Sequence, residues 1–409
     1  MAQPLPRLRM NLDFMPSPVA ERPGLLIRDP YHYSDATLIV PPVLIAALEL
    51  FDGSNTELDL RETLVRLTGE LEVGPVVEHL RDTLNTAGFL ENETYERMRV
   101  DRHQEFAESP LRPAAHAGQA YPDEPEEFRT TFNRYFNGSN PHSVPNLCAI
   151  AAPHVSPEGG WESYRDAYGA LSSDHRDRVF VILGTSHYGE PDHFGLTRKN
   201  FVTPLGETRT EQAWVEELAE SSPEAVKMED YCHATEHSIE FQIAFLQHLY
   251  GPQVRTLPIL VGSFARSVLQ RGRPEEDPSI ARFLDALGEL HARRSSELIW
   301  VLGVDMSHIG RRYTDSFSAL AYQDEMIEVS ARDNQRIARI SEGDSAGFWE
   351  LVSGNHGDLR HDDLRWCGSA PLYTFLKAVP NARSRLLRYQ HWQIDPHSVV
   401  SFAAMAFAT

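Results

Sequence analysis

The clearest pattern in this chain is a series of short, almost wholly apolar runs, each followed by a stretch whose apolar residues recur at helical spacing. The alternation begins near Ala115 and continues to the C-terminus. It is typical of a sheet whose strands alternate along the chain with covering helices. We therefore expect residues 115–409 to form an α/β domain with an open sheet and helices on both faces.

The first hundred residues follow a different pattern, in which three stretches have apolar positions at helical spacing. These stretches are residues 42–51, 58–67 and 76–87. A turn at Asp52-Gly53-Ser54 separates the first two, and Gly88 is placed to end the third. We expect a small winged-helix-like domain within residues 1–100, followed by a polar linker over residues 101–114.

Composition and charge exclude several classes of partner. The net charge is −21, from 59 acidic and 38 basic residues, so most of the surface repels nucleic acid and anionic lipid. No apolar run approaches the roughly 20 residues that a membrane helix needs. The prolines and the early Asp13 near the start do not fit a signal peptide. We expect a cytoplasmic protein with neither a nucleic-acid nor a membrane partner.

Cysteine usage agrees with a reducing compartment. The chain has three cysteines, Cys148, Cys232 and Cys367, which are too few and too widely spaced for a disulfide framework. Each thiol is therefore available for packing or for a metal.

Three of the most apolar runs end in a histidine. They are 147–154, 179–187 and 298–308, and they end at His154, His187 and His308. The carboxyl ends of strands in an open α/β sheet are where ligands bind, because the loops converge there. One such histidine alone is typical of a hydrogen-bonded turn, but three on one edge supply a facial set of imidazoles. The pattern predicts a metal site.

Cys367 is the natural fourth member of this set. It precedes an apolar helical stretch that runs to Val379, so its sulfur is expected near a helix N-terminus, which lowers the pKa of a thiol. The thiolate is the metal-binding form of cysteine. The alternative for Cys367 is a buried residue that acts only as a small hydrophobe.

These residues belong to six short motifs whose order resembles that of the Memo family. The motifs are His116-Ala-Gly-Gln-Ala-Tyr121, Ala152-Pro-His154, Gly184-Thr-Ser-His187, Glu236-His-Ser-Ile-Glu240, Asp305-Met-Ser-His308 and Cys367-Gly368. The resemblance covers residues 115–409. Bacterial members resemble protein B of the AmmeMemoRadiSam system, which also contains a radical S-adenosylmethionine enzyme and an AMMECR1-type protein. Both are implied as partner proteins.

The resemblance also implies a fold and a ligand set. The Memo family is similar in fold to the class III extradiol dioxygenases, and its metal centre is associated with iron, with copper also reported. Matched motif by motif, His154, His187, His308 and Cys367 are the expected ligands. The loops around the three histidines depart from the family's usual sequence, so we expect the substrate pocket to differ.

Three further residues are candidates for catalytic roles. His237 is expected at a helix start, where Glu236 or Glu240 can orient it as a general acid or base. The alternative is that these two glutamates form a solvated acidic face. Asp305 is expected to fix the tautomer of His308 or to be a further ligand. His116 is expected either to line the same edge or to be a structural turn residue.

The predicted ligands permit three kinds of function. With Fe2+ the protein would be a non-haem oxidoreductase, although a cysteine ligand makes the ring-cleaving activity of the extradiol dioxygenases doubtful. With zinc the same ligands would activate water for hydrolysis. Without turnover the protein would bind metal and peptide only.

The N-terminal domain resembles the PqqD-like peptide-binding modules found beside radical-enzyme systems. The resemblance rests on the apolar first helix, the turn at Asp52-Gly53-Ser54, the second helix and the closing Gly88-Phe89-Leu90. It implies a peptide partner for this domain. A helical cap without a partner of its own is the alternative.

Overall fold

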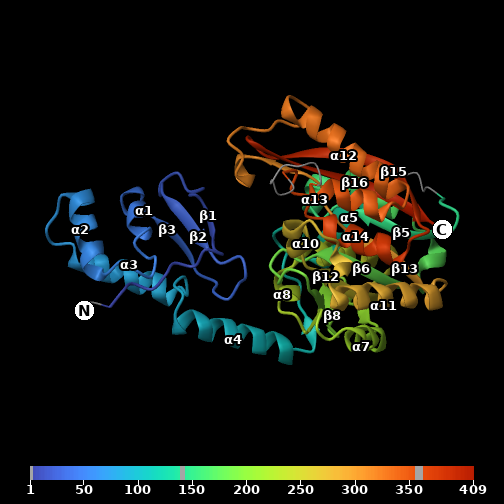
Figure 1. Cartoon of the computed structure of the whole chain (residues 1–409), viewed down its shortest axis with the longest axis horizontal. Helices are drawn as coiled ribbons and strands as arrows, with labels where there is room; N and C mark the ends of the chain where they lie inside the picture. The colour runs from blue at the N-terminus through green and yellow to red at the C-terminus, as the bar shows by residue number, and fades with distance from the viewer. Residues whose placement is uncertain (1–2, 139–142, 355–362) are drawn as a thin grey trace. The chain divides into compact units, whose positions relative to one another are not determined.

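The computed structural model describes residues 3–138, 143–354 and 363–409 (Figure 1). It divides into two compact units, residues 1–108 and residues 109–409. The structure is mixed α/β, with a large mixed sheet in the second unit and a small antiparallel sheet in the first. Among the described residues, no helix combines the length and the apolar character needed to cross a membrane.

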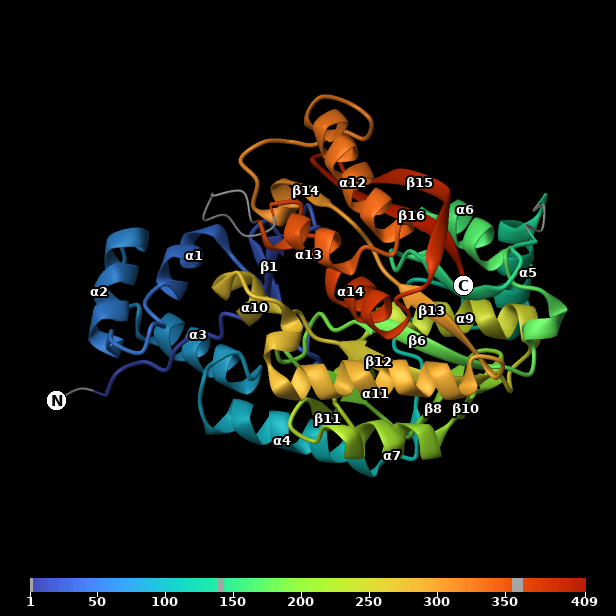
Figure 2. The ribbon, with the colours of Figure 1, turned by 45° about the vertical axis from the view of Figure 1, so that its right-hand side comes forward.

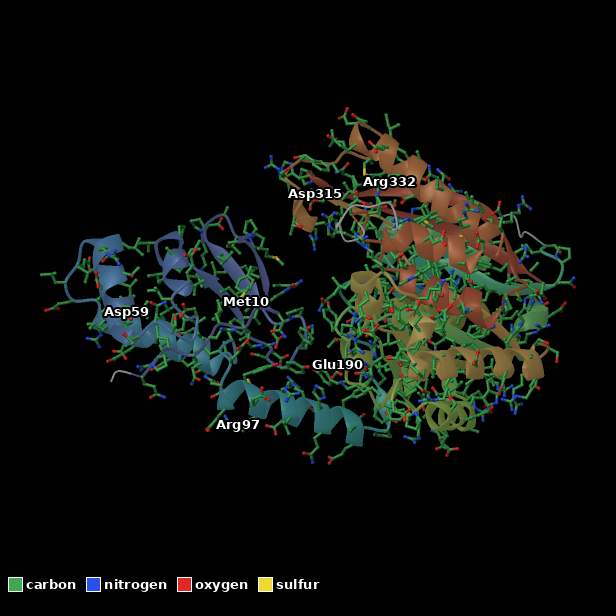
Figure 3. All side chains as sticks on the ribbon, in the orientation of Figure 1. Met10, Asp59, Arg97, Glu190, Asp315 and Arg332 are labelled. Carbon is green, nitrogen blue, oxygen red and sulfur yellow. The ribbon has the colours of Figure 1, made fainter. Side chains whose placement is uncertain are left out.

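The N-terminal unit packs helices against a three-stranded antiparallel sheet of order β1-β2-β3. Its strands are β1 (Asp13–Pro16), β2 (Leu25–Arg28) and β3 (Thr37–Val40). Its helices are α1 (Pro42–Leu48), α2 (Glu57–Thr68), α3 (Gly74–Thr86) and α4 (Glu93–Glu108). The first three coincide with the predicted helical stretches, whereas the sheet was not predicted. Asp59, labelled in Figure 3, caps α2 together with Thr56.

Helix α4 covers much of the segment expected to be a linker. It has a single buried side chain, Phe106, so it lacks the apolar stripe by which a helix is recognised in a sequence. Its surface instead has ion pairs at helical spacing, such as Arg99 with Glu96 and Arg102 with Glu105. The ordered helix ends one residue before the second unit begins.

The large sheet has, within the described residues, the order β11-β7-β12-β6-β13-β5-β16-β14. Its centre is a parallel block of β5 (Leu147–Ala152), β6 (Val179–Thr185), β12 (Arg255–Val261) and β13 (Leu298–Gly303). Antiparallel β16 (Ser398–Ala408) extends this block beside β5. Because the four central strands are parallel, their carboxyl ends meet at one edge, as the sequence predicted.

The remaining strands lie at the borders of the large sheet or in a small sheet of order β4-β8-β9. They are β4 (Leu111–Arg112), β7 (Phe194–Leu196), β8 (Asn200–Thr203), β9 (Gly206–Glu207), β10 (Arg209–Thr210), β11 (Val226–Met228), β14 (His308–Gly310) and β15 (Arg383–Asp395). Strand β15 pairs with β16 along most of its length.

Helices cover both faces of the large sheet (Figure 2). Successive side chains of β6 alternate between the faces: Val181 packs in one apolar cluster and Ile182 in the other. The helices of the first cluster are α7 (Gln212–Ser221), α11 (Pro278–Arg294), α12 (Glu325–Ser341), α13 (Ser345–Ser353) and α14 (Ser369–Ala378). Those of the second are α5 (Pro125–Phe136), α6 (Pro157–Tyr168) and α9 (His237–Tyr250). The unit also contains the short helices α8 (Cys232–Thr235) and α10 (Ala265–Gln270).

A buried ion pair fixes the start of α9. Arg112 and Glu240 are both fully buried and bonded to each other. The Arg112 guanidinium also donates to the backbone carbonyls of His233 and Glu236. The Glu240 carboxylate accepts the backbone N–H groups of Ala115 and His116. The pair therefore connects the first residues of the second unit to the junction of α8 and α9.

We predict that Arg112→Met destabilises the second unit by about 3–5 kcal/mol, because it leaves the Glu240 carboxylate buried without a counter-charge. Urea unfolding followed by tryptophan fluorescence measures this unit alone, since all six tryptophans lie beyond residue 108. Arg282→Met, which removes a surface pair with Glu224, is the control and should cost less than about 1 kcal/mol. Equal losses in the two variants would contradict the structural role of the pair.

Candidate metal centre

Three histidines converge at the carboxyl edge of the central strands. His154 follows β5, His187 follows β6, and His237 is the first residue of α9. One ring nitrogen from each lies within 4.8 Å of the others, a spacing that can hold a metal ion. The ring centroids are 4.9 Å apart for His187 and His237, and 5.0 Å apart for His154 and His187. His154 and His187 were predicted as ligands, whereas His237 was predicted as an acid or base.

Hydrogen bonds orient the rings of the histidines that follow strands. The Nδ1 atom of His154 lies 2.9 Å from the Gly303 carbonyl, and that of His187 lies 3.0 Å from the Glu236 carboxylate. In the neutral rings, with the proton on Nδ1 donated to these oxygens, Nε2 has the lone pair that a metal ion can take up in place of a proton. Metal-binding histidines are usually held in this way.

The buried Glu236 carboxylate organises two of the three histidines. It accepts hydrogen bonds from the backbone N–H groups of His187, His237 and Ser238. It also accepts one from the ring Nδ1–H of His187. Burial opposes its charge, but His187 and these hydrogen bonds hold the pKa of Glu236 well below its usual range. Glu236 and Glu240 are 1% and 0% exposed, so the alternative of a solvated acidic face is wrong.

Cys367 lies at the same site. Its Sγ atom is 3.2 Å from Nε2 of His154, and Cys367 precedes the first turn of α14. Burial opposes the thiolate, but His154 and His187 lower the pKa of the Cys367 thiol below its usual value. Burial likewise opposes the charged form of His187, but Glu236 and Cys367 raise the pKa of His187 well above its usual value. The thiol and the imidazole thus favour each other's charged forms.

His308 stands beside the three-histidine group but is not a member of it among the described residues. It begins β14, and its ring packs edge-on against Tyr313 at 5.0 Å. Its Nδ1 atom lies 3.0 Å from the Met306 carbonyl and 3.2 Å from the Arg365 carbonyl. The Nε2 atom is therefore left for the site, as it is in His154 and His187.

Asp305 holds the loop that bears His154. Its carboxylate accepts the backbone N–H groups of His154 and Val155, and one oxygen lies 3.5 Å from Nε2 of His154. Burial raises the pKa of Asp305 to about 6, although the nearby His308 opposes the shift. The hydrogen bonds that orient the His308 ring come from backbone carbonyls, and not from Asp305 as expected.

His116 lies behind the three-histidine group. Its ring meets the His237 ring edge-on with centroids 5.7 Å apart, and its Nε2 atom is 3.0 Å from the Thr235 carbonyl. Burial lowers the pKa of His116, so its neutral form is favoured. In this position His116 supports the ring of His237 and the turn before α9.

A buried carboxylate that the sequence analysis missed supports the other side of the site. Asp333, on α12, accepts hydrogen bonds from four side chains. The donors are Ser307, Trp366, Tyr389 and Ser401. Ser307 precedes His308 and Trp366 precedes Cys367, so one carboxylate ties together the segments that contain both. An aspartate inside a polar helix gives no sign of this role in the sequence.

The fold and the histidine cluster can now be compared with known proteins. A family model described as Memo-like protein matches residues 112–406. The chain belongs to the Memo family. It is similar to a MEMO1 family protein of Aquifex aeolicus, at 27% identity over 93% of this chain and 95% of that protein. It is also similar to a MEMO1 family protein of Desulfurococcus amylolyticus, at 26% identity over 71% of this chain and 96% of that protein.

The alignment with the Aquifex Memo protein is longer than the second unit, so it includes part of the N-terminal unit. Among solved structures, an uncharacterized protein of Escherichia coli K12 aligns with a TM-score of 0.41 and 12% identity. That alignment covers 63% of this Memo chain and 99% of the other chain.

We predict that iodoacetamide alkylates Cys367 of the metal-free protein well before Cys148 or Cys232. Burial raises the pKa of the Cys148 thiol to about 12 and also raises that of Cys232. The Cys367 rate should increase with pH only up to its lowered pKa and then level off, because the thiolate is the reactive form.

Mass spectrometry of the alkylated peptides gives the three rates separately. His154→Ala should shift the Cys367 profile to higher pH, whereas His291→Ala, far along α11, should leave it unchanged. A Cys367 rate that still rises above pH 9 in the unmodified protein would rule out the lowered pKa.

Proposed function

We propose that this protein is a mononuclear non-haem iron oxidoreductase that oxidises a small molecule with dioxygen. In this proposal His154, His187 and His237 hold one Fe2+ ion together with the Cys367 thiolate. The observation that carries it is the convergence of three imidazoles and one thiol of lowered pKa at the carboxyl edge of the central strands.

The donor set suits such an ion. Imidazole and thiolate are ligands that iron, copper and zinc accept, whereas magnesium and calcium prefer oxygen. Bound iron would supply the activation of dioxygen. Because a thiolate takes the place of the carboxylate found in extradiol dioxygenases, the redox potential would differ, and we do not extend the proposal to ring cleavage.

The chain's own residues would orient the ligands and manage protons. Glu236 fixes His187 and His237, and Asp305 fixes the backbone of His154. His308 offers a fourth imidazole, whose Nδ1 faces the Met306 carbonyl, so Nε2 is the nitrogen that it can use for proton transfer. In our assignment His308 exchanges protons with the substrate and His237 is a ligand. The reverse assignment, with His308 as ligand and His237 as acid or base, follows from the sequence alone.

Metal content after anaerobic purification tests the ligands. We expect stoichiometric iron in the wild type and its loss in His154→Ala, His187→Ala, His237→Ala and Cys367→Ala, because each removes a ligand. His291→Ala is the control. Iron retained in His237→Ala but lost in His308→Ala would overturn our assignment and establish the reverse one. Iron retained in all variants would refute the site.

Cofactor exchange separates the two enzymatic functions. We expect dioxygen consumption by the iron-loaded protein with a bound substrate and none by the zinc-loaded protein. Ester or amide hydrolysis by the zinc form without dioxygen would favour the zinc-type hydrolase instead. Iron binding without turnover of either kind would leave a metal-binding protein.

A specific observation also favours peptide binding by the N-terminal unit. In the described part of the chain β3 pairs only with β2, so its other edge has unpaired backbone groups. Between β3 and α3 lie two cavities of about 250 and 380 Å3, and Leu38 and Thr83 line both. We propose that an extended peptide adds to β3 here and places its side chains in the cavities.

This second proposal agrees with the winged-helix-like, PqqD-like interpretation of the unit. A radical S-adenosylmethionine enzyme and an AMMECR1-type protein stay predictions of the family resemblance. Either protein could contain the peptide segment that binds here, or could act on the peptide after it has bound.

We predict that Thr83→Trp weakens peptide binding at least about tenfold, because the indole takes up space at a position that lines both cavities. Peptides would be selected from a random 12-residue library on the full-length protein, and their affinities measured by fluorescence anisotropy. Thr63→Trp, a half-buried threonine of α2 outside the cavities, is the matched control. Binders insensitive to Thr83→Trp, or no binders, would contradict the proposal.

A further inference from the structure

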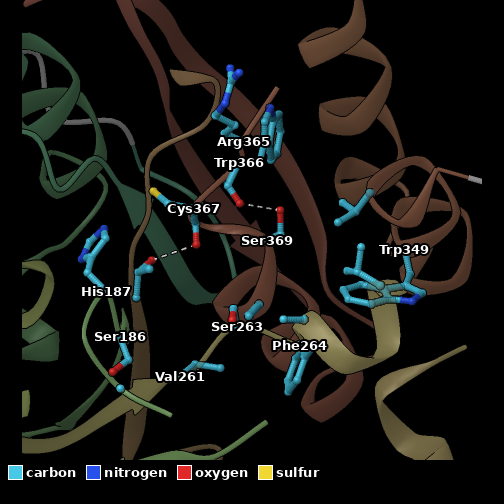
Figure 4. A pocket seen from close by; sticks show the side chains of 16 residues that line it. Ser186, His187, Val261, Ser263, Phe264, Trp349, Arg365, Trp366, Cys367 and Ser369 are labelled. Carbon is cyan, nitrogen blue, oxygen red and sulfur yellow. Dashed lines mark hydrogen bonds between the residues drawn. The ribbon is translucent and has the colours of Figure 1, made fainter. Parts of the chain in front are cut away.

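A cavity of about 400 Å3 opens beside the metal centre. His187 and Cys367 line one end of it, and Phe264, Val268 and Trp349 are among the residues that line the other parts (Figure 4). Small-molecule sites usually measure about 300–1,000 Å3, so this cavity has room for a compact ligand of one or two rings. A molecule bound here would lie directly against two of the proposed metal ligands.

The apolar wall of the cavity is preformed. Phe264 and Trp349 are 2% and 3% exposed, and their rings meet edge-on at 6.0 Å. The Trp349 indole donates its N–H to the Gly272 carbonyl, and Tyr373 packs behind it at 4.9 Å. An indole held at its polar end and supported from behind presents a fixed aromatic surface, which an aromatic ligand can contact at little entropic cost.

The charge of the lining restricts the ligand further. None of the described residues that line the cavity is an aspartate, a glutamate or a lysine. The lining contains one arginine, Arg365, whose guanidinium already donates to both oxygens of Asp315. A charged ligand of either sign would lose its hydration here, because the described lining has no carboxylate and its one guanidinium is already paired. An uncharged ligand has no charge to desolvate.

We propose that this cavity binds an uncharged aromatic small molecule, the substrate of the metal centre. The aromatic body would lie against Phe264 and Trp349, and the polar end would point toward His187 and Cys367. The proposal rests on the proposed function for the reaction that follows binding. Binding itself depends only on the cavity walls and can be measured without metal.

Three naphthalene probes test the class of ligand on the metal-free, full-length protein. They are neutral 2-naphthol, anionic 2-naphthoate and the protonated, cationic 2-naphthylmethylamine. By isothermal titration calorimetry we expect 2-naphthol to bind, and 2-naphthoate and the amine each to bind at least about tenfold more weakly. Equal binding of either charged probe, or no binding of 2-naphthol, would overturn the proposal.

Two measurements locate the probe in the cavity. Val268→Trp should weaken 2-naphthol binding at least about tenfold, whereas Leu269→Trp, the exposed neighbour outside the cavity, should not. In the wild type, saturating 2-naphthol should slow the alkylation of Cys367. The alkylation measurement is made on the wild-type protein, so it does not depend on the folding of a variant. Unchanged alkylation, or binding unaffected by Val268→Trp, would place the probe elsewhere and overturn the proposal.

Failure of this proposal can be told apart from failure of the proposed function. Iron content is measured on the same preparations as probe binding. Probe binding and Cys367 protection in a protein that takes up no iron would refute the metal function alone. Stoichiometric iron without probe binding would refute the cavity proposal alone.

Discussion

The candidate metal centre depends on the buried carboxylate of Glu236. A carboxylate removed from water is costly unless its oxygens are fully bonded, and here backbone and ring N–H groups of His187, His237 and Ser238 satisfy them. These groups come from the loop after β6 and the first turn of α9. The Glu236 carboxylate therefore holds two distant parts of the chain together and caps α9. The same carboxylate orients the imidazoles that these two parts contain.

Asp305 and Asp333 do the same for the rest of the site. Asp305 bonds the backbone of His154, and Asp333 bonds Ser307 and Trp366, which adjoin site residues in the sequence. All three carboxylates bind backbone groups or neighbouring side chains, so the ligand atoms themselves stay available. His154 and His187 lower the pKa of the Cys367 thiol, and Glu236 and Cys367 raise the pKa of His187, so a metal ion that bound both groups would displace the His187 proton.

The sequence predicted the parts of the site that depend on local order, and missed those that depend on packing. His154 and His187 could be placed because an apolar run ends two residues before each. His237 was recognised at a helix start, but its ring meets the other two because α9 packs against the sheet, a tertiary contact that the sequence does not reveal. Asp333 was missed because its position in a helix does not reveal which hydrogen-bond donors from distant parts of the chain contact it. The strands β1–β3 are too short for an alternation of apolar and polar residues to be recognised in the sequence.

The candidate metal centre has buried carboxylates on one side and an apolar cavity on the other, and this arrangement limits the reactions that it can support. The buried carboxylates lie behind the imidazoles, while the cavity in front is bounded by Phe264, Val268 and Trp349. An ion between them would be surrounded by negative groups on one side and, with a ligand bound, by little water on the other. Hydrolysis needs a water on the ion and oxidation needs dioxygen there, so either reaction requires one position on the ion that the ligand in the cavity leaves open. At such a site the ion, and not the cavity, decides between the two reactions, because iron can activate dioxygen whereas zinc has no redox chemistry.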